Sequence, residues 1–275
     1  CIYGASKWKT YDKNISDRET DLKEDRVRIE TKLSDRRSKF VDELTNIVNK
    51  VSQFKGKGSV RMLEDYIEQI NDIKKQLTTA TAAMEDINAK EVLIGWEVTE
   101  FEALAEAQSM LEPFDKLWNL VYDHQKANTK WRETPLFGGE INPETVESDV
   151  SAMWRTAFKL KAGFEQDNHP KPANVATKVK SDLDAFKENV PLLHALCNPG
   201  LRERHWQEIS NVVGFSLEPD PSFNLKRMLD MDIGTYVNEI GEISESAAKE
   251  YQIESGLDVQ FQEWAPLSME FKEWA

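Results

Sequence analysis

The sequence predicts an all-α protein: an elongated bundle of long antiparallel helices followed by shorter packed helices. The first observation is that all ten prolines lie at or after Pro113. The first 112 residues therefore contain no proline, the residue type that most strongly ends helices. The second is that apolar residues recur there at steps of seven, four and three, which is the helical period. The third is a composition of 31 % charged and 40 % hydrophobic residues, typical of amphipathic helices with solvated outer faces.

The longest predicted helix covers residues 12–55. Its apolar positions form one stripe, with members Ile15, Leu22, Ile29, Leu33, Phe40, Leu44, Ile47, Val51 and Phe54. A helix of about 40 residues at 1.5 Å per residue is roughly 60 Å long. A compact globule of this chain length has a radius of gyration of only about 19 Å. We therefore expect a rod or a curved arm.

A turn and a second long helix are predicted next. The Gly56-Lys57-Gly58-Ser59 stretch ends the first helix, and Ser59 is a candidate N-cap for the second. The second stripe has the same period as the first, with members Val60, Leu63, Ile67, Ile70, Leu77, Met84 and Ile87. The shared period predicts that this helix folds back antiparallel on the first.

Beyond Gly95 we expect shorter helices. The first presents one apolar face, made of Phe101, Leu104, Leu111, Phe114, Leu117, Trp118 and Val121, followed by Trp131. A break is predicted at Pro135–Gly139. Asn142-Pro143-Glu144 then begins a helix, with Asn as the N-cap, Pro at the first helical position and an acid in the first turn.

The helix that begins there is expected to bury one face and to stop near Gly163. The predicted core positions are Val146, Val150, Met153, Trp154, Ala157 and Phe158. A loop is predicted at Asn168–Pro172. The next helix runs from near Ser181 through Cys197 with a kink at Pro191. Its inward residues are Leu183, Phe186, Val190, Leu193 and Leu196.

Two more helices complete the predicted fold. Asn198-Pro199-Gly200 ends the preceding helix, and a short helix from Leu201 presents Trp206, Ile209 and Val213 before Gly214. A turn follows at Pro219–Pro221. The last helix is long and closes at Pro266, with the positions Tyr236, Ile240, Ile243, Ala247, Glu250, Glu254, Leu257, Phe261 and Trp264 on one face. These elements predict three helical segments, 1–58, 59–134 and 135–275.

Charge and cysteine content exclude several classes of protein. Residues 1–61 hold 15 Lys and Arg against 10 Asp and Glu, and the remaining residues hold 20 against 39. An acidic majority repels nucleic acid and anionic lipid, so we expect neither as a partner. The two cysteines, Cys1 and Cys197, favour a reducing compartment over a disulfide framework. The start at Cys1 and the end within an amphipathic pattern suggest an excised fragment.

No residue pattern indicates catalysis or metal binding. His124, His169, His194 and His205 lack the spacing of zinc motifs, and we expect the last two to find local partners on a helix face and at a helix start. Gly56–Ser59 lacks the spacing of a phosphate loop and is interpreted as a turn. Two pairs of carboxylates are interpreted as solvated helix faces: Glu100 with Glu102, and Glu239 with Glu242.

Tryptophan is frequent in this chain, which has eight. Five of them recur on the apolar stripes: Trp118, Trp131, Trp154, Trp206 and Trp264. We interpret them as packing residues between helices, in preference to a platform for a ligand. Exposed members would mark contact surfaces.

Several segments that follow one another along the chain resemble one family. They are Leu117-Trp118-Asn119-Leu120-Val121, Trp131, INPETVESDV at 141–150, FKENVPLLHAL at 186–196, NPGLRERHW at 198–206, FNLKRML at 223–229, AAKEYQIE at 247–254 and Trp264. They resemble dynein heavy chains, of axonemal more than cytoplasmic type, where the tail passes into the linker that bends across the AAA+ motor ring. The resemblance is clear from about Met62 onward, whereas residues 1–61 match only in character. It implies that 1–58 is a long tail or neck helix, that 59–134 is a helical bundle completing the neck and opening the linker, and that 135–275 is the amino-terminal helical subdomain of the linker.

The resemblance implies a non-catalytic lever that couples ATP-driven changes in a downstream ring to movement along microtubules. The family landmarks carried over are Trp118, Trp131, Pro199, Gly200, Arg204, His205, Trp206, Glu250, Glu254 and Trp264. No catalytic, cofactor or metal residue is implied, because ATP and Mg belong to the downstream ring. The implied partners are that ring and, as candidates, dynein light or intermediate chains or another heavy chain, without direct microtubule contact. The implied location is the axoneme of a cilium or flagellum.

A different class of function is compatible with long helices alone. A spectrin-like scaffold or tethering module would use a basic amino-terminal hairpin to recruit protein partners. Internal repeats would support it, but no fixed period recurs between the two halves of the chain.

Bending of a lever is expected at Pro135–Gly139, Asn168–Pro172 or Asn198–Gly200.

Overall fold

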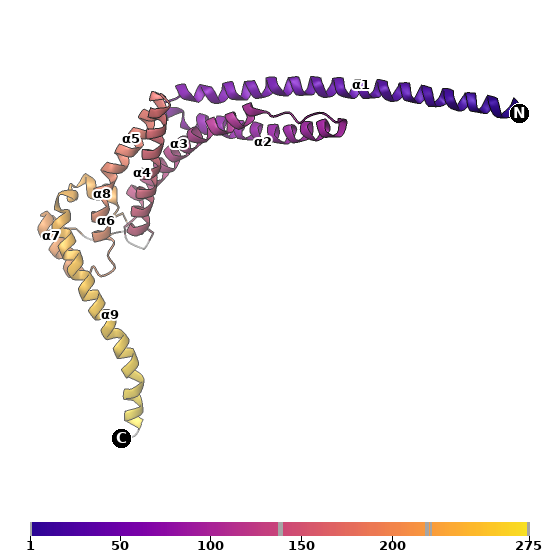
Figure 1. Ribbon diagram of the computed structural model, residues 1–275. Coiled ribbons are helices and arrows are strands. Elements are labelled where there is room, and N and C mark those ends of the chain that lie inside the picture. Colours follow the sequence, from indigo (N-terminus) through magenta and orange to yellow (C-terminus); the bar gives the residue numbers. More distant parts are fainter. Residues whose placement is uncertain (1, 137–139, 218–219, 221, 274–275) are drawn as a thin grey trace. The chain divides into compact units, whose positions relative to one another are not determined.

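The computed structural model describes the backbone of residues 2–136, 140–217, 220 and 222–273, and within these ranges the side chains of residues 11–260. The chain divides into two compact units, Cys1–Trp118 and Asn119–Ala275 (Figure 1). In the described ranges helices predominate, no strand forms, and Pro135 and Asn224 make an isolated bridge. The predicted all-α class is confirmed. The division into segments 1–58, 59–134 and 135–275 stays a prediction.

The first unit is built on a helical hairpin. Its elements are α1 (Ile2–Ser52), the 3₁₀ turns η1 (Gln53–Gly56) and η2 (Val60–Met62), α2 (Leu63–Ile94) and the first half of α3 (Glu102–Glu133). Lys50 Nζ lies 2.9 Å from Gln76 Oε1, and Arg37 Nη1 lies 3.6 Å from Glu91 Oε1. Later residues of α2 thus meet earlier residues of α1, which confirms the antiparallel prediction and is visible in Figure 1.

The apolar stripe of α1 is covered over only part of its length. Its covered members are all buried: Leu33, Phe40, Leu44, Ile47, Val51 and, just past the helix, Phe54. Ile15, Leu22 and Ile29 are 57 %, 67 % and 53 % exposed, so the predicted contact is wrong for this part of the stripe. The reason is length, because α2 has 32 residues and α1 has 51. At 1.5 Å per residue α1 is about 76 Å long, more than predicted.

The turn between the two helices forms as predicted, except at Ser59. Ser59 precedes η2 but makes no side-chain capping bond, and Met62 occupies the N-cap position of α2. Lys57 closes the turn instead, with Nζ 3.3 Å from the centre of the Phe54 ring and 5.0 Å from that of Tyr66. Burial among these groups lowers the pKa of Lys57. The cation–π contact therefore holds the end of α1 against the start of α2.

The face that α2 turns inward largely matches the second stripe. Leu63, Ile70, Leu77 and Ile87 are buried. Val60, Ile67 and Met84 are half-buried. Gly95 ends the helix with φ 78°, a conformation that glycine adopts without steric cost, and Trp96 N donates to Glu91 O at 2.8 Å.

The expectation of shorter helices beyond Gly95 is wrong for α3, which has 32 residues and passes through Pro113. A proline inside a helix costs about 3 kcal/mol. On both sides of Pro113 the helix buries large apolar side chains, each worth about 1.5–3 kcal/mol, so packing outweighs the lost hydrogen bond. The predicted apolar face is confirmed, because all of its members are buried: Phe101, Leu104, Leu111, Phe114, Leu117, Trp118 and Val121.

The second unit contains the rest of α3 and the later helices. These are α4 (Pro143–Gln166), α5 (Pro170–Lys187), α6 (Val190–Leu196), α7 (Glu203–Val213), α8 (Leu225–Asp230), the 3₁₀ turn η3 (Ile233–Tyr236) and α9 (Val237–Glu273). The cap of α4 is as predicted, with Asn142 Oδ1 accepting from Thr145 N at 3.1 Å. The side chain of His194 on α6 lies 3.1 Å from Glu147 on α4, so this histidine finds the local partner that was expected.

Three predictions for α4 and α5 are wrong. Helix α4 does not stop at Gly163, because the chain leaves the helix only at Asn168, where φ is 56°. The predicted loop at Asn168–Pro172 is instead a short turn: α5 begins at Pro170, since proline fits the first turn of a helix. Phe158 was assigned to the core, yet it is 50 % exposed. Met153 and Trp154 are partly exposed.

Helices α5 and α6 replace the single kinked helix that was predicted. The break falls at Glu188 and Asn189, so that Pro191 lies in the first turn of α6 rather than in a helix interior. The predicted inward residues are all buried: Leu183, Phe186, Val190, Leu193 and Leu196. The burial pattern was therefore right although the helix boundary was not.

The later elements follow the predictions with two exceptions. Trp206, Ile209 and Val213 are buried on α7, and Gly214 ends that helix with φ 83°. Helix α8 was not predicted. Pro266 does not close α9, since the helix continues to Glu273. The break at Pro135–Gly139 and the turn at Pro219–Pro221 fall partly outside the described residues.

Among the described side chains of α9, those of its first part are packed and those that follow are exposed. Ile240 and Ala247 are buried, whereas Leu257 is 59 % exposed. The side chains of Phe261 and Trp264 lie outside the described residues. None of the described helices combines the length and the apolar character that crossing a bilayer requires.

Candidate functional site

The most densely bonded site in the second unit joins the segment between α6 and α7 to one face of α9. We call it the α9 clamp, made of Asn198, Gly200, Arg202, Arg204 and His205 on one side and Ser244, Ala247, Glu250 and Glu254 on the other. Five of the predicted landmark residues belong to it: Gly200, Arg204, His205, Glu250 and Glu254. The structure therefore brings together residues that lie about fifty positions apart in the sequence.

Asn198 ties the end of α6 to α9 through both ends of its amide. Its Nδ2 donates to the backbone oxygen of Ser244 at 2.7 Å and to the hydroxyl of Ser244 at 2.9 Å, while its Oδ1 accepts from Gly200 N at 2.9 Å. The Ser244 hydroxyl in turn donates to Ala195 O at 2.9 Å. Only an amide supplies donors and an acceptor in this arrangement, so the end of α6 is fixed to α9.

Gly200 lets the two backbones approach closely. A Cβ atom at this position would lie 2.6 Å from Ala247 O and 2.9 Å from the Cβ of Tyr251. Both distances are shorter than real Cβ contacts, and one of the atoms is backbone, which cannot turn aside. The glycine is thus required by space rather than by a positive φ.

His205 caps α7 from a buried position. Its ring is 2 % exposed, and Nδ1 accepts from the backbone N–H of Arg202 at 3.1 Å. Because Nδ1 accepts, the hydrogen-bond pattern assigns the neutral ring its proton on Nε2. Nε2 lies 3.2 Å from Glu250 Oε2, but the approach is poorly aligned for a hydrogen bond. The histidine is an end cap that also touches α9.

Two arginines reach from α7 and the residue before it to carboxylates on α9. Arg204 Nε donates to Glu250 Oε2 at 3.1 Å, and its Nη2 donates to both Glu250 and Glu254. Arg202 Nη2 donates to Glu254 Oε2 at 3.2 Å. The bonds from Arg204 lower the pKa of Glu250 and Glu254, with Arg202 contributing at Glu254. These groups are solvated, so they set the position of α9 more than they stabilise it.

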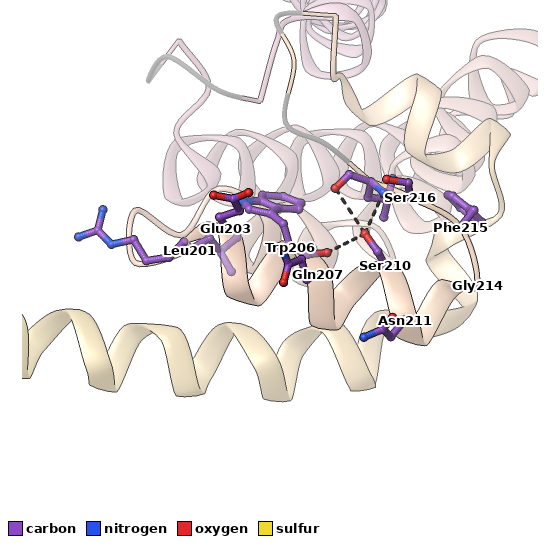
Figure 2. Close-up of a pocket in the computed structure, with 11 residues that line it drawn as sticks. Leu201, Glu203, Trp206, Gln207, Ser210, Asn211, Gly214, Phe215 and Ser216 are labelled. Carbon is purple, nitrogen blue, oxygen red and sulfur yellow. Dashed lines mark hydrogen bonds between the residues drawn. The ribbon is translucent and has the colours of Figure 1, made fainter.

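Trp206 lies at the edge of a groove beside the clamp (Figure 2). The ring is 5 % exposed and meets Phe223 edge-on, with centroids 5.7 Å apart. The groove has a volume of about 1110 Å³ and runs between α7 and residues 214–217. One of the two serines that line it, Ser210, donates to Trp206 O at 2.7 Å and accepts from Leu217 N at 2.8 Å, so the hydroxyl of Ser210 is engaged in structure.

The other reactive side chains are also held in structural roles. Burial raises the pKa of the Cys197 thiol to about 11, which keeps it protonated at neutral pH. Burial lowers the pKa of His124 on α3, while Asp182 opposes this shift. In the part of the chain that the structure describes, no three His, Cys, Asp or Glu side chains gather to hold a metal. Glu102, Glu239 and Glu242 are exposed on helices, as predicted, whereas Glu100 is exposed but lies in the segment before α3.

Trp118 and Trp131, two of the remaining landmarks, lie away from the clamp. Trp118 on α3 is fully buried, with its ring centroid 4.6 Å from that of Tyr66. Trp131 is 3 % exposed, with its ring centroid 4.8 Å from that of Phe186. Both are packing residues, as predicted. Pro199 is exposed next to the clamp. Ser244, which anchors Asn198, was missed, although small residues at 244 and 247 on one face of α9 indicate where another backbone can approach.

Residues 104–275 match the family described as "Dynein heavy chain, N-terminal region 2". The chain belongs to the dynein heavy chain family. Dynein axonemal heavy chain 3 of Homo sapiens is 34 % identical over 208 residues, covering 74 % of this chain and 5 % of that protein. The Mus musculus protein of the same name is 29 % identical over 248 residues, covering 90 % of this chain and 6 % of the relative.

A further relative, Dynein axonemal heavy chain 12 of Homo sapiens, is 24 % identical over 246 residues. That match covers 87 % of this chain and 8 % of the relative, so this dynein segment spans only a small part of the proteins that it matches. The resemblance drawn from the sequence is confirmed, including its axonemal character. The α9 clamp lies wholly within the region that matches the family.

Proposed function

We propose that this dynein segment is a non-catalytic mechanical element, the passage from tail to linker, which couples ATP-driven changes in a downstream AAA+ ring to movement along microtubules. The supporting observation is that the family match spans the whole second unit, where the clamp holds α9 in a fixed position on α6 and α7. A lever transmits displacement only if its helices do not slide past one another.

The contacts of the second unit bear on where such a lever would bend. Asn198–Gly200 is held by three hydrogen bonds and a close backbone approach, which favours a clamp over a hinge. Asn168 and His169 form a tight turn, and Pro172 beyond it is buried. These contacts therefore disfavour bending at these two candidate breaks.

The parent protein would supply what this segment lacks. ATP and Mg would bind in the downstream ring, and that ring would be the principal partner of the segment. Dynein light or intermediate chains, or another heavy chain, are candidate partners of α1. The names of the relatives place those proteins in the axonemal class, and we propose the axoneme of a cilium or flagellum for this chain.

The proposal is tested in a full-length heavy chain that carries Asn198→Ala with Arg204→Ala. Microtubule gliding should slow several-fold while the ATPase rate of the ring is retained, because the lever is loosened and the ring is not. Lys249→Ala, an exposed residue on α9, is the matched control and should glide normally. Unchanged gliding by the double variant, together with faster hydrogen exchange in α9, would contradict the lever. ATPase activity of the pure segment would contradict its non-catalytic role.

A further inference from the structure

Two stacked aromatic side chains on the outer face of α4 are open to solvent. Trp154 and Phe158 stack with centroids 5.5 Å apart and an angle of 5° between the rings. Phe158 is 50 % exposed, whereas Val150 and Ala157 on the same helix are 1 % and 0 % exposed. We call this pair the aromatic ledge. Single exposed apolar residues are ordinary, but a stacked aromatic pair is the usual anchor of a protein interface.

The ledge is held in place by α5. Trp154 Nε1 donates to Asp184 Oδ1 at 2.6 Å, and Lys180 Nζ lies 5.0 Å from the centre of the tryptophan ring. Lys180 also pairs with Asp184 at 2.7 Å, and this bond is the main reason that the pKa of Asp184 is lowered. The indole is therefore oriented before any partner arrives, which reduces the entropy lost on binding.

A hollow of about 300 Å³ lies beside the ledge. It is lined by Val150, Ser151, Trp154, Arg155 and Lys187. The apolar lining comes from a valine and an indole, and the rim carries two cations. Such a hollow has the size and lining to accept an aliphatic side chain from a partner. The two cations at its rim would then face the partner residues on either side of that side chain.

The cations around the ledge are not in ion pairs. Within the described residues, Arg155, Lys159 and Lys187 make no ion pair, although the charge of Lys187 contributes to the lowered pKa of Asp184. Two nearby acids are already engaged: Asp184 with Trp154 and Lys180, and Glu165 with Lys161 at 3.7 Å. This excess of positive charge stands out in a chain whose residues after position 61 carry 20 basic against 39 acidic side chains.

We propose that the aromatic ledge docks an acidic protein segment, with one aliphatic side chain in the hollow and carboxylates opposite Arg155, Lys159 and Lys187. Charge complementarity selects this occupant, because a basic segment would meet three cations that are in no ion pair. The proposal does not depend on the lever function.

Three synthetic helical peptides test it, with identical leucines and with flanking residues that are all Glu, all Gln or all Lys. Binding to the full chain is measured by calorimetry. The Glu peptide should bind tightest, the Gln peptide about tenfold more weakly, and the Lys peptide not at all. Added salt should weaken the Glu peptide most, since the rim is solvated.

Variants of the chain separate the parts of the site. Phe158→Ala should weaken the Glu peptide about tenfold while leaving helicity unchanged, since the ring is half-exposed. Arg155→Glu with Lys187→Glu should reverse the order of the Glu and Lys peptides. Leu93→Ser, which changes another exposed apolar residue at 84 % exposure, is the matched control and should bind as the unaltered chain does.

Three outcomes would overturn the proposal. They are equal binding of the Glu and Lys peptides, indifference to Phe158→Ala, and no binding of any peptide at millimolar concentration. Sedimentation showing a dimer that Phe158→Ala dissociates would make a second copy of the chain the occupant instead. Each result is obtained on the intact 275-residue chain.

Discussion

The α1–α2 hairpin and the α9 clamp hold pairs of helices together by different means. In the hairpin, a row of buried apolar side chains such as Phe40 and Leu44 meets α2, and one buried carboxylate, Glu91, accepts from the N–H and the hydroxyl of Thr99 at 2.8 and 2.7 Å. In the clamp, an amide, two arginines and a bare glycine backbone meet α9.

The two constructions differ in what they specify. Apolar burial is worth more energy, at about 25 cal/mol per Å², but a repeating stripe tolerates a shift of one repeat along the helix. The clamp contributes less to the free energy of folding, because its ion pairs are solvated. It nevertheless specifies the position of α9 more narrowly, since the backbone at Gly200 packs directly against Ala247 and Asn198 bonds to Ser244. The hairpin therefore supplies stability, and the clamp supplies the position of α9.

The largest expected effect concerns the hairpin and comes from comparing the same substitution at two leucines of α1. Leu44→Ala should cost about 3 kcal/mol of unfolding free energy, the usual value for a buried leucine. Leu22→Ala should stay within about 0.5 kcal/mol, because Leu22 is 67 % exposed whereas Leu44 is 1 % exposed. Urea unfolding followed by circular dichroism measures both. Equal losses would mean that something covers the whole stripe in solution.

A smaller effect tests the close approach in the clamp. Gly200→Ala should cost about 2 kcal/mol through overpacking against Ala247 and should speed hydrogen exchange in α9. Gly163→Ala is the matched control, since nothing lies within 4 Å of the Cβ that it would add. Alanine inside a helix should stabilise α4 by about 0.5–1 kcal/mol. Destabilisation by both changes would show that space at Gly200 is not the cause.

The sequence was sufficient to predict the helical hairpin, because a stripe of apolar residues at heptad spacing indicates which face of each helix is buried. It did not record how far the partner helix reaches, so Ile15, Leu22 and Ile29 were assigned to a contact that α2 is too short to make. Periodicity also placed Phe158 in the core, because Phe158 follows Trp154 by one turn. A hydrophobic pattern cannot tell a core face from a docking face.

Proline and the clamp show a second limit. Pro191 was interpreted as a kink within one helix, yet it lies in the first turn of a new helix. Pro113 lies inside α3, and tertiary burial carries the helix through it. Five of the clamp residues were found through resemblance to a family and not through spacing, since Arg204 and Glu250 are far apart in the sequence. The bond from Asn198 to Ser244 needed the structure, because no local pattern pairs an amide with a distant serine.

The smallest expected effect concerns the pH dependence of the clamp. Arg204 lowers the folded pKa of Glu250 and Glu254 below the ordinary value of 4.5. A carboxylate whose folded pKa is depressed adds stability above its unfolded pKa, and this stability is lost as the pH falls through the folded pKa. The difference in Tm between the unaltered chain and Arg204→Ala should therefore be largest near pH 7 and vanish in acid, below both pKa values. Arg155→Ala, which removes an unpaired arginine, should show no such dependence. A difference that grew towards low pH would mean that the ion pairs do not hold α9.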